Sequence, residues 1–457
     1  MVGCANAVKR VQIDVHYLFD PFPGWEEVIQ RMRAVASKWR VVGLKVAMHP
    51  YGHQGGGHDV DMGKYMDNIA GVVRALTALM PDVRRMGCQG SDRSQAASLI
   101  CGFLAWRYAD QLRWFDSNHR ITVPPGCQFT RLRLVSLSYD LATDYQIPQM
   151  AAGELVDVML MDGPSNHSWA SFSADSDSRV IEFTNLKGLL AVYRTTHLEN
   201  EVAVRHRDGH PWKLQFPRLE SLNIQCGENI CPLLEYAVLP SHMESIQIQL
   251  RSATYQDHTN LVLPATKRLI LGITGESEGD PSGLPVINRF FESARGSESL
   301  ELHINDRMLP VVPDSITCTA LTHLLVAART SVDTMLAFIE RLPNLTELTL
   351  YTLDLSDTQA DISVPGADED TVVEPLHTWL ESLTIEYDIS IHSPDTATAV
   401  VKYMLLRIPT LFRLVSRMTP EGLVLSFVEQ YAPRYPHLRG VEMELCRGDL
   451  PEYAMLG

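Results

Sequence analysis

One short pattern, L-x-x-L-x-L, recurs through the chain and restricts what it can fold into. Its clearest copy lies in LPNLTELTL, residues 342–350, with leucines at positions 345, 348 and 350. Side chains alternate along a strand, so the fourth and sixth residues of this hexamer point to a core, and the third and fifth point away from it. One such strand cannot bury its apolar side alone. The pattern therefore predicts stacked copies.

Further hexamers follow the same frame. In the second half they are LESLNI (219–224), MESIQI (243–248), TKRLIL (266–271), SESLEL (297–302), LTHLLV (321–326), LESLTI (380–385), LFRLVS (411–416) and LRGVEM (438–443). Weaker copies in the first half are VKRVQI (8–13), VVGLKV (41–46), VRRMGC (83–88), LRWFDS (112–117), LRLVSL (132–137), LVDVML (155–160) and LKGLLA (186–191). The sixteen copies recur about every 29 residues, a period typical of leucine-rich repeats.

The intervals between hexamers carry two further signals. Proline stands two residues before six hexamers, at Pro81, Pro217, Pro264, Pro343, Pro409 and Pro436. Proline ends a helix and favours an extended predecessor, as expected just before a strand. Apolar residues at helical spacing occupy several intervals, as in Ile69, Val72, Val73 and Leu76 or in Val400, Val401, Met404 and Leu405. Each unit is therefore predicted to be strand, loop, amphipathic helix, loop.

These signals together predict an α/β fold, a leucine-rich-repeat solenoid or horseshoe with an inner parallel β-ladder and outer helices. We expect a single solenoid over residues 1–457. Its repeats should be irregular over 1–180 and clearer over 181–457, with loop insertions near 274–284 and 354–375.

Composition excludes several classes of protein. Apolar residues at 45% and charged residues at 21% exclude wholesale disorder. The net charge of −16 and the lack of a dense Lys/Arg cluster in the sequence oppose nucleic-acid binding. No apolar run reaches the roughly 18 residues of a membrane span, and no secretory signal is visible. The eight cysteines show no CxxC and are expected to be reduced and mostly buried, in a cytoplasmic or nuclear monomer.

Three segments were weighed as sites of chemistry. Ser277 lies in GESEG (275–279), but a turn rather than a helix follows it, so a surface loop is expected and a hydrolase is a distant alternative. The acidic run 354–374 and the Ser/Asp-rich segment 163–178 lack a calcium-loop spacing and predict solvated insertions. No nucleotide or zinc motif is present. We therefore expect no catalytic residue, no cofactor and no enzymatic activity.

The stretch HPYGHQGGGHDVDM, residues 49–62, raises the question of a metal site. His49, His53, His58 and Asp59 could bind Zn²⁺ or Ni²⁺ adventitiously. The run Gly55–Gly57 raises the entropic cost of fixing ligand geometry. An insertion loop between a strand and a helix is the expected structure, open to partner contact, and no metal ligand is predicted.

The outward residues of the hexamers form the expected binding surface, a concave face suited to a protein or peptide. Arg268, Arg413 and Arg417 interrupt this polar to acidic stripe, which would fit a basic partner. The residues predicted to contact a partner are Asn223, Gln225, Gln247, Gln249, Glu301, His303, Glu347, Tyr351, Glu386 and Glu442.

The hexamers, the apolar-proline lead-in and the irregular repeat length resemble the leucine-rich-repeat region of fungal F-box/LRR proteins, of the RNI-like superfamily. The resemblance implies a scaffold whose repeats hold a substrate while an N-terminal F-box of about 40 residues contacts a ubiquitin ligase. Here a repeat-like strand begins by Val8 and leaves no room for an F-box, and the usual asparagine after the strand is mostly missing. A truncated gene model or an F-box-less relative would explain this.

The expected function is therefore a non-enzymatic protein-interaction scaffold, with a substrate receptor of a ubiquitin ligase as one version. The alternative is a regulator on the same repeat fold, such as a GTPase activator. That alternative predicts a catalytic arginine on a rim loop, and no arginine in the sequence stands out.

Overall fold

The computed structural model describes the parts of the chain that form the repeat framework. The described residues are 8–17, 22–38, 40–50, 62–90, 95–118, 127–138, 154–161, 180–192, 213–226, 237–250, 263–273, 291–292, 294–309, 318–354, 364, 373–376, 378–388 and 394–446.

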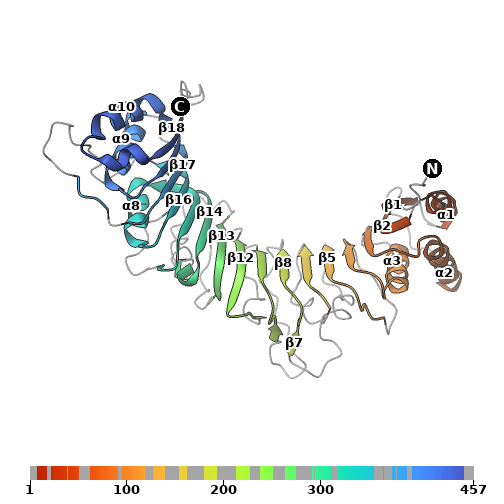
Figure 1. Cartoon of the computed structure of the whole chain (residues 1–457). Helices are drawn as coiled ribbons and strands as arrows, with labels where there is room; N and C mark the ends of the chain where they lie inside the picture. Colours follow the sequence, from red (N-terminus) through yellow and green to blue (C-terminus); the bar gives the residue numbers. More distant parts are fainter. Residues whose placement is uncertain are drawn as a thin grey trace, which may run out of the picture. The chain divides into compact units, whose positions relative to one another are not determined.

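Sixteen strands form one parallel sheet, and they follow one another in chain order (Figure 1). The first eight are β1 (Val8–Tyr17), β2 (Arg40–Pro50), β3 (Arg85–Gly90), β4 (Trp114–Ser117), β5 (Leu134–Ser138), β6 (Asp157–Met161), β8 (Gly188–Val192) and β10 (Ser221–Cys226). The others are β12 (His242–Leu250), β13 (Ala265–Ile273), β14 (Ser299–Met308), β15 (His323–Ser331), β16 (Glu347–Asp354), β17 (Ser382–Asp388), β18 (Arg413–Pro420) and β19 (Glu442–Cys446). Each of the sixteen strands overlaps one predicted hexamer.

The strand register confirms the hexamer frame almost throughout. The fourth residues of successive hexamers pair directly in two runs, Val11–Leu44–Met86–Phe115–Val135–Val158–Leu189 and Ile246–Leu269–Leu300–Leu324–Leu348–Leu383–Leu414. Apolar fourth and sixth residues are buried in strand after strand, as Leu348 and Leu350 illustrate. The prediction of an α/β fold with a long parallel ladder is confirmed. A horseshoe form and membership of the leucine-rich-repeat class stay predictions.

The last hexamer departs from the predicted frame by two residues. Leu414 pairs with Met443, not with Val441. The cause is a 3-10 helix, η3 (Pro436–Gly440), which buries Leu438 and delays the strand until Glu442. Alternation with a period of two assigns side chains to faces but does not choose between registers two residues apart.

Two compact units divide the chain. Unit 1 comprises Met1–Ile224 and Cys231–Pro240, and unit 2 comprises Gln225–Ile230 and Ser241–Gly457. Unit 1 begins with the helices α1 (Phe22–Ala36), α2 (Met62–Leu79) and α3 (Gln95–Arg107), which lie side by side in Figure 1 and precede β2, β3 and β4. The predicted apolar face of α2 is buried, with Ile69 and Leu76 fully covered.

Later intervals of unit 1 contain a second set of strands among their described residues. The short strands β7 (Val180–Glu182), β9 (Lys213–Gln215) and β11 (Ala237–Val238) form a second parallel ladder. Directly after β7 and β9, Phe183 and Phe216 stack with ring centroids 5.2 Å apart. A short ladder and stacked aromatic residues thus lie beside the main sheet here, and the rest of these intervals, where helices are predicted, lies outside the described residues.

Unit 2 has helices at its C-terminal end. They are α8 (Val332–Arg341), α9 (Pro394–Arg407) and α10 (Glu421–Tyr431), and the short η2 (Ala294–Gly296) precedes β14. Ser331 caps α8, since its side chain accepts a hydrogen bond from the Thr334 backbone N–H at 3.1 Å. The predicted apolar face of α9, including Val400 and Met404, is buried.

The prolines before the strands have a specific role in turns. The Leu345 N–H donates to the Leu342 carbonyl at 3.1 Å, so Pro343 is the second residue of a four-residue turn. Leu411 and Ile408 close an equivalent turn at Pro409, at 3.2 Å. Proline fits this position because its fixed φ suits the first corner of the turn. Each turn delivers the first leucine of a hexamer into the core.

Four cysteines agree with the expectation of reduced, buried thiols. Cys88, Cys101, Cys127 and Cys318 are free and buried. Burial raises the pKa of Cys127 to about 11 and that of Cys318 to about 11, so both are protonated at neutral pH. Within the described ranges, none of the helices has the length and apolar character needed to cross a membrane.

Candidate interaction surface

The sheet has one face that carries the third, fifth and seventh residues of the hexamers, which we call the open face. In β16 these residues are Glu347, Thr349 and Tyr351, and all three are accessible while Leu348 and Leu350 are buried. Because neighbouring hexamers pair in register, equivalent residues form rows that run from strand to strand. The open face is therefore a set of polar rows laid over a continuous core.

All ten predicted partner-binding residues lie on the open face and are at least partly accessible. Gln247 and Gln249 lie on β12, Glu301 and His303 on β14, and Glu347 and Tyr351 on β16. The others are Asn223 and Gln225 on β10, Glu386 on β17 and Glu442 on β19. Their placement on one face agrees with the hexamer frame. Their role in binding stays a prediction.

Charges on the open face of unit 2 are largely paired across neighbouring strands. Arg268 Nη2 lies 2.6 Å from Glu301 Oε1, and His303 Nε2 lies 3.6 Å from the other oxygen of the same carboxylate. Arg417 Nε lies 2.9 Å from Glu386 Oε2. Arg413 and Glu444 are in looser contact at 4.0 Å. The arginines that interrupt the predicted acidic stripe thus neutralise part of it.

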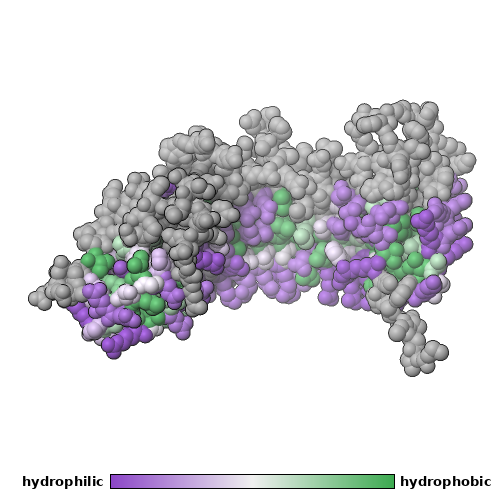
Figure 2. Space-filling model, turned by 90° about the horizontal axis from the view of Figure 1, so that it is seen from above, coloured by the Kyte–Doolittle hydropathy of each residue, from purple (hydrophilic) through white to green (hydrophobic). Residues whose placement is uncertain are grey.

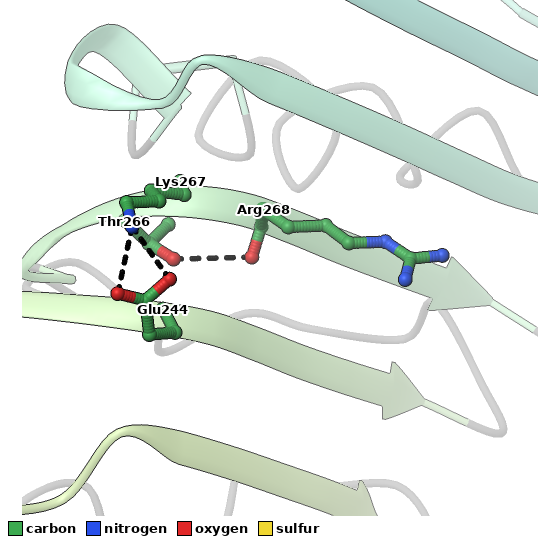
Figure 3. A network of polar contacts seen from close by, with 4 residues as sticks. All are labelled: Glu244, Thr266, Lys267 and Arg268. Carbon is green, nitrogen blue, oxygen red and sulfur yellow. Dashed lines mark hydrogen bonds and ion pairs between the residues drawn. The ribbon is translucent and has the colours of Figure 1, made fainter.

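Figure 3 shows that Lys267 and Arg268, neighbours on one strand, extend in different directions. Lys267 on β13 reaches Glu244 on β12, and its Nζ lies 2.8 Å from each carboxylate oxygen. Arg268, the next residue, extends away from this pair, and its carbonyl accepts a hydrogen bond from Thr266 Oγ1 at 3.1 Å. Both cations of this strand are therefore held by glutamates, Lys267 from one side and Arg268 from the other.

Unit 1 presents a different site, which the sequence analysis missed. A hollow of about 380 Å³ opens on β1 to β4, and we call it the tryptophan hollow. Its lining residues are Arg10, Val11, Gln12, Gly43, Leu44, Lys45, Arg85, Met86, Gly87, Trp114 and Asp116. Most of these are third and fifth residues of hexamers, so the hollow belongs to the open face.

Trp114 is the centre of the tryptophan hollow. The guanidinium carbon of Arg85 lies 5.2 Å from its ring centroid, and that of Arg10 lies 6.0 Å away. Arg10 is on β1 and Trp114 is on β4, three strands away, or roughly 14 Å at the usual strand spacing. Arg10 must therefore lie across the sheet to reach the ring.

Both intervening strands carry a glycine here, and the absence of a side chain at Gly43 makes this reach possible. A Cβ at Gly43 would lie 2.8 Å from Arg10 Cγ, closer than real Cβ atoms approach. Arg10 thus occupies the space that a side chain on β2 would fill. A Cβ at Gly87 would lie 3.4 Å from Lys45 Cγ and 3.9 Å from Asp116 Oδ2, in ordinary contact. Gly87 therefore keeps the hollow open rather than preventing a clash.

The hollow is basic although the chain is acidic. Within the described part of the chain, Arg10, Lys45 and Arg85 take part in no ion pair of 4.0 Å or less. The one lining carboxyl group is Asp116. Burial raises its pKa, although a hydrogen bond with Ser136 and the charge of Lys45 act in the opposite direction. Three cations thus face one carboxylate that burial makes harder to ionise.

A row of arginines extends this basic region. Arg113 N–H donates to the Arg84 carbonyl at 2.8 Å, and Arg133 N–H donates to the Arg113 carbonyl at 3.0 Å, so the three stand side by side directly before β3, β4 and β5. Arg84, Arg113 and Trp114 help to line a second, adjoining hollow of about 420 Å³. The sequence shows no dense Lys/Arg cluster, yet lateral stacking gathers these residues into one. The overlooked signal was the second, third and fifth residues of the first five hexamers, VKRVQI, VVGLKV, VRRMGC, LRWFDS and LRLVSL.

Several predicted features lie outside the described residues. They include residues 51–61 of the histidine stretch, GESEG at 275–279, the segment 163–178 and most of the acidic run. Where the acidic run begins, Asp354 is not solvated as expected. It is 2% exposed and accepts a hydrogen bond from Arg329 Nε at 2.5 Å. Among the described residues, no group of three or more His, Cys, Asp or Glu is arranged to hold a metal ion.

Hydrophobic side chains lie among hydrophilic ones on the described surface that Figure 2 shows. The most exposed large apolar side chain is Trp379, at 65%, followed by Phe412 and Val238 at 49% each, among the described residues. Such isolated apolar side chains are ordinary on a protein surface.

Comparison with known proteins adds no assignment: no family model matches the chain, and no curated protein matches it.

Proposed function

We propose that this chain is a non-enzymatic protein-binding scaffold of the leucine-rich-repeat type and that it holds its partner on the open face. The observation that carries the proposal is the register of the hexamers, which arranges polar side chains in rows along an extended ladder. A parallel ladder of this kind offers many side chains to one ligand without requiring a deep cavity. The ten predicted contact residues lie on this face.

Site-specific photo-crosslinking tests the proposal. A photoreactive residue at Gln247, on the open face, should form a crosslink to a protein partner in an extract of the native cells. The same residue at Gln430, an exposed position on α10, is the matched control. Crosslinks formed only from Gln430 would place the partner on the helices and contradict the proposal.

A substrate receptor of a ubiquitin ligase is one version of this scaffold, and its support is the resemblance to F-box/LRR repeats. Affinity purification of the full protein from native cells should then recover the adaptor of that ligase. Recovery of partners without the adaptor would remove this version and leave the scaffold standing.

The competing proposal, a GTPase activator, needs an arginine free to enter a partner's active site. On the open face of unit 2, Arg268 and Arg417 are each ion-paired with a glutamate, and Arg413 lies 4.0 Å from Glu444. This pairing favours the scaffold for unit 2.

A further inference from the structure

We propose that the tryptophan hollow binds an anionic side chain, carboxylate or phosphate, of an extended segment of the protein partner. The inference rests on the proposed function and adds the chemistry of the ligand to it. It concerns unit 1 alone and the residues Arg10, Gly43, Lys45, Arg85, Gly87 and Trp114.

Convergent charge is the first support. Arg10 and Lys45 extend from β1 and β2, and Arg85 from β3, into the same hollow. Like charges repel one another, and Asp116 is one carboxyl group against these three cations, which have no ion-pair partner within 4.0 Å among the described residues. An anion placed between them would relieve that repulsion. Arginine is well suited to this task because its planar fork matches the oxygens of a carboxylate or phosphate.

Preorganisation is the second support. Trp114 holds both guanidinium groups by cation–π contacts, so the arginines lose less freedom when a ligand arrives. An arginine over an aromatic ring keeps N–H groups available at its edge. The indole Nε1 of Trp114 is buried and has no hydrogen-bond partner in the described structure, which makes an acceptor more favourable still.

The surroundings of the hollow favour a peptide over a free ion. The arginine row of Arg84, Arg113 and Arg133 continues the positive charge from strand to strand, about 4.8 Å at a time. Farther along the open face, Leu134, Met159 and Leu190 are half-buried apolar residues. A segment that carries several anionic side chains and an apolar neighbour would contact both regions.

The charge of the rest of the chain opposes a long polyanion. The net charge is −16, and glutamates dominate the charged residues of the open face of unit 2. A nucleic acid would be repelled by this acidic background, whereas a short anionic motif would meet only the local basic region. An acidic or phosphorylated protein segment is therefore the ligand class that we infer.

Fluorescence polarisation with the full chain tests the inference. The probes are a labelled peptide with glutamate at alternate positions, its phosphoserine counterpart, its glutamine counterpart and a single-stranded DNA of similar charge. We expect the glutamate or the phosphoserine peptide to bind at least about tenfold more tightly than the glutamine peptide, with affinity falling as salt rises. The stronger of the two identifies the source of the anion. Equal binding of the glutamine peptide, or tighter binding of the DNA, overturns the inference.

Matched variants assign the binding to the hollow. The double change Arg10→Gln and Arg85→Gln should weaken binding of the anionic peptide at least about tenfold. Arg268→Gln removes a cation from the open face of unit 2 and should leave binding within about twofold. If the double variant does not fold, Lys45→Gln and Gly87→Leu test the same hollow by charge and by volume. Unchanged binding in all hollow variants that fold would contradict the assignment.

The two proposals can fail separately. A crosslink from Gln247 together with no peptide binding at the hollow would reject the anion site and keep the scaffold. Peptide binding at the hollow together with crosslinks only from Gln430 would reject the wider open-face proposal and keep a local anion site.

Discussion

The open faces of unit 1 and unit 2 use the same hexamer frame but differ in how their charges are satisfied. In unit 2 the arginines lie beside glutamates of neighbouring strands, as Arg268 does beside Glu301 and Arg417 beside Glu386. In unit 1 the arginines gather around Trp114 without such partners in the described structure. The hexamer frame determines where these side chains lie. The residue type at each position determines whether its charge is neutralised by a neighbouring strand or remains available to a ligand.

The cores of the two units should respond alike to the loss of an inward leucine. Leu44→Ala in unit 1 and Leu348→Ala in unit 2 each remove a fully buried side chain, and each should lower the free energy of unfolding by about 2–5 kcal/mol. Urea unfolding measures both, with the exposed change Gln430→Ala as control. A negligible loss for either leucine would break the equivalence of the two cores.

Two aspartates should respond in opposite directions. Asp354 of unit 2 is buried against Arg329, and Asp354→Asn should cost about 1–3 kcal/mol because it removes a charge-assisted hydrogen bond. Asp116 of unit 1 has a pKa raised by burial, so Asp116→Asn should leave stability unchanged or increase it at neutral pH. Equal destabilisation by both changes would refute the contrast.

The pH dependence follows from the sign of the Asp116 shift. Its pKa in the folded state is higher than its ordinary value of 3.8, so its favourable contribution to stability is present below that value and is lost as pH rises through the folded pKa. In Asp116→Asn this part of the pH dependence should disappear. Unfolding free energies of the two proteins, measured across the acidic range, check it.

Alkaline pH should lower the free energy of unfolding of both units for the same reason. Cys127 in unit 1 and Cys318 in unit 2 both have a pKa raised from 9.0 to about 11 by burial. The folded state holds the proton more tightly, so stability should fall as pH rises from about 9 through about 11. Cys127→Ala and Cys318→Ala should each flatten the decline. A thiol that reacts readily with maleimide in the folded protein at neutral pH would contradict its buried placement.

The smallest expected change in stability concerns the difference between ion-paired and unpaired arginines. Arg417→Gln leaves Glu386 without its ion pair and should cost up to about 1 kcal/mol. Arg85→Gln relieves repulsion in the hollow and should change stability by less than about 0.5 kcal/mol in either direction. Thermal unfolding measures both effects, and added salt should reduce each of them, because it screens the ion pair and the repulsion alike.

The hexamers predicted the strands well because burial and alternation act on each strand separately. Leu324, Leu348 and Leu383 pair directly, as their common position requires. The register of the last strand could not be read from alternation, since Val441 and Met443 lie on the same side of one strand. Its displacement depends on η3, whose effect is visible only in three dimensions.

The tryptophan hollow was harder to predict for a different reason. Arg10, Arg85 and Trp114 are scattered in the sequence, and none is unusual by itself. Their meeting depends on the absence of a side chain at Gly43, and a glycine within a strand indicates close approach of another group without identifying that group. The acidic stripe was predicted because its residues could be recognised one at a time.

Lateral assembly of the hollow has a consequence for how such a site can change in evolution. Every lining residue of the hollow lies on β1, β2, β3 or β4, so insertions between these strands alter the length of the gene without altering the residues of the hollow. Loss of one whole repeat would act differently. Removing the unit that contains Gly43 and Lys45 would set Arg10 beside Arg85 and abolish the gap between them. Duplication or deletion of repeats can therefore create or erase specificity in one step, while every remaining residue stays the same.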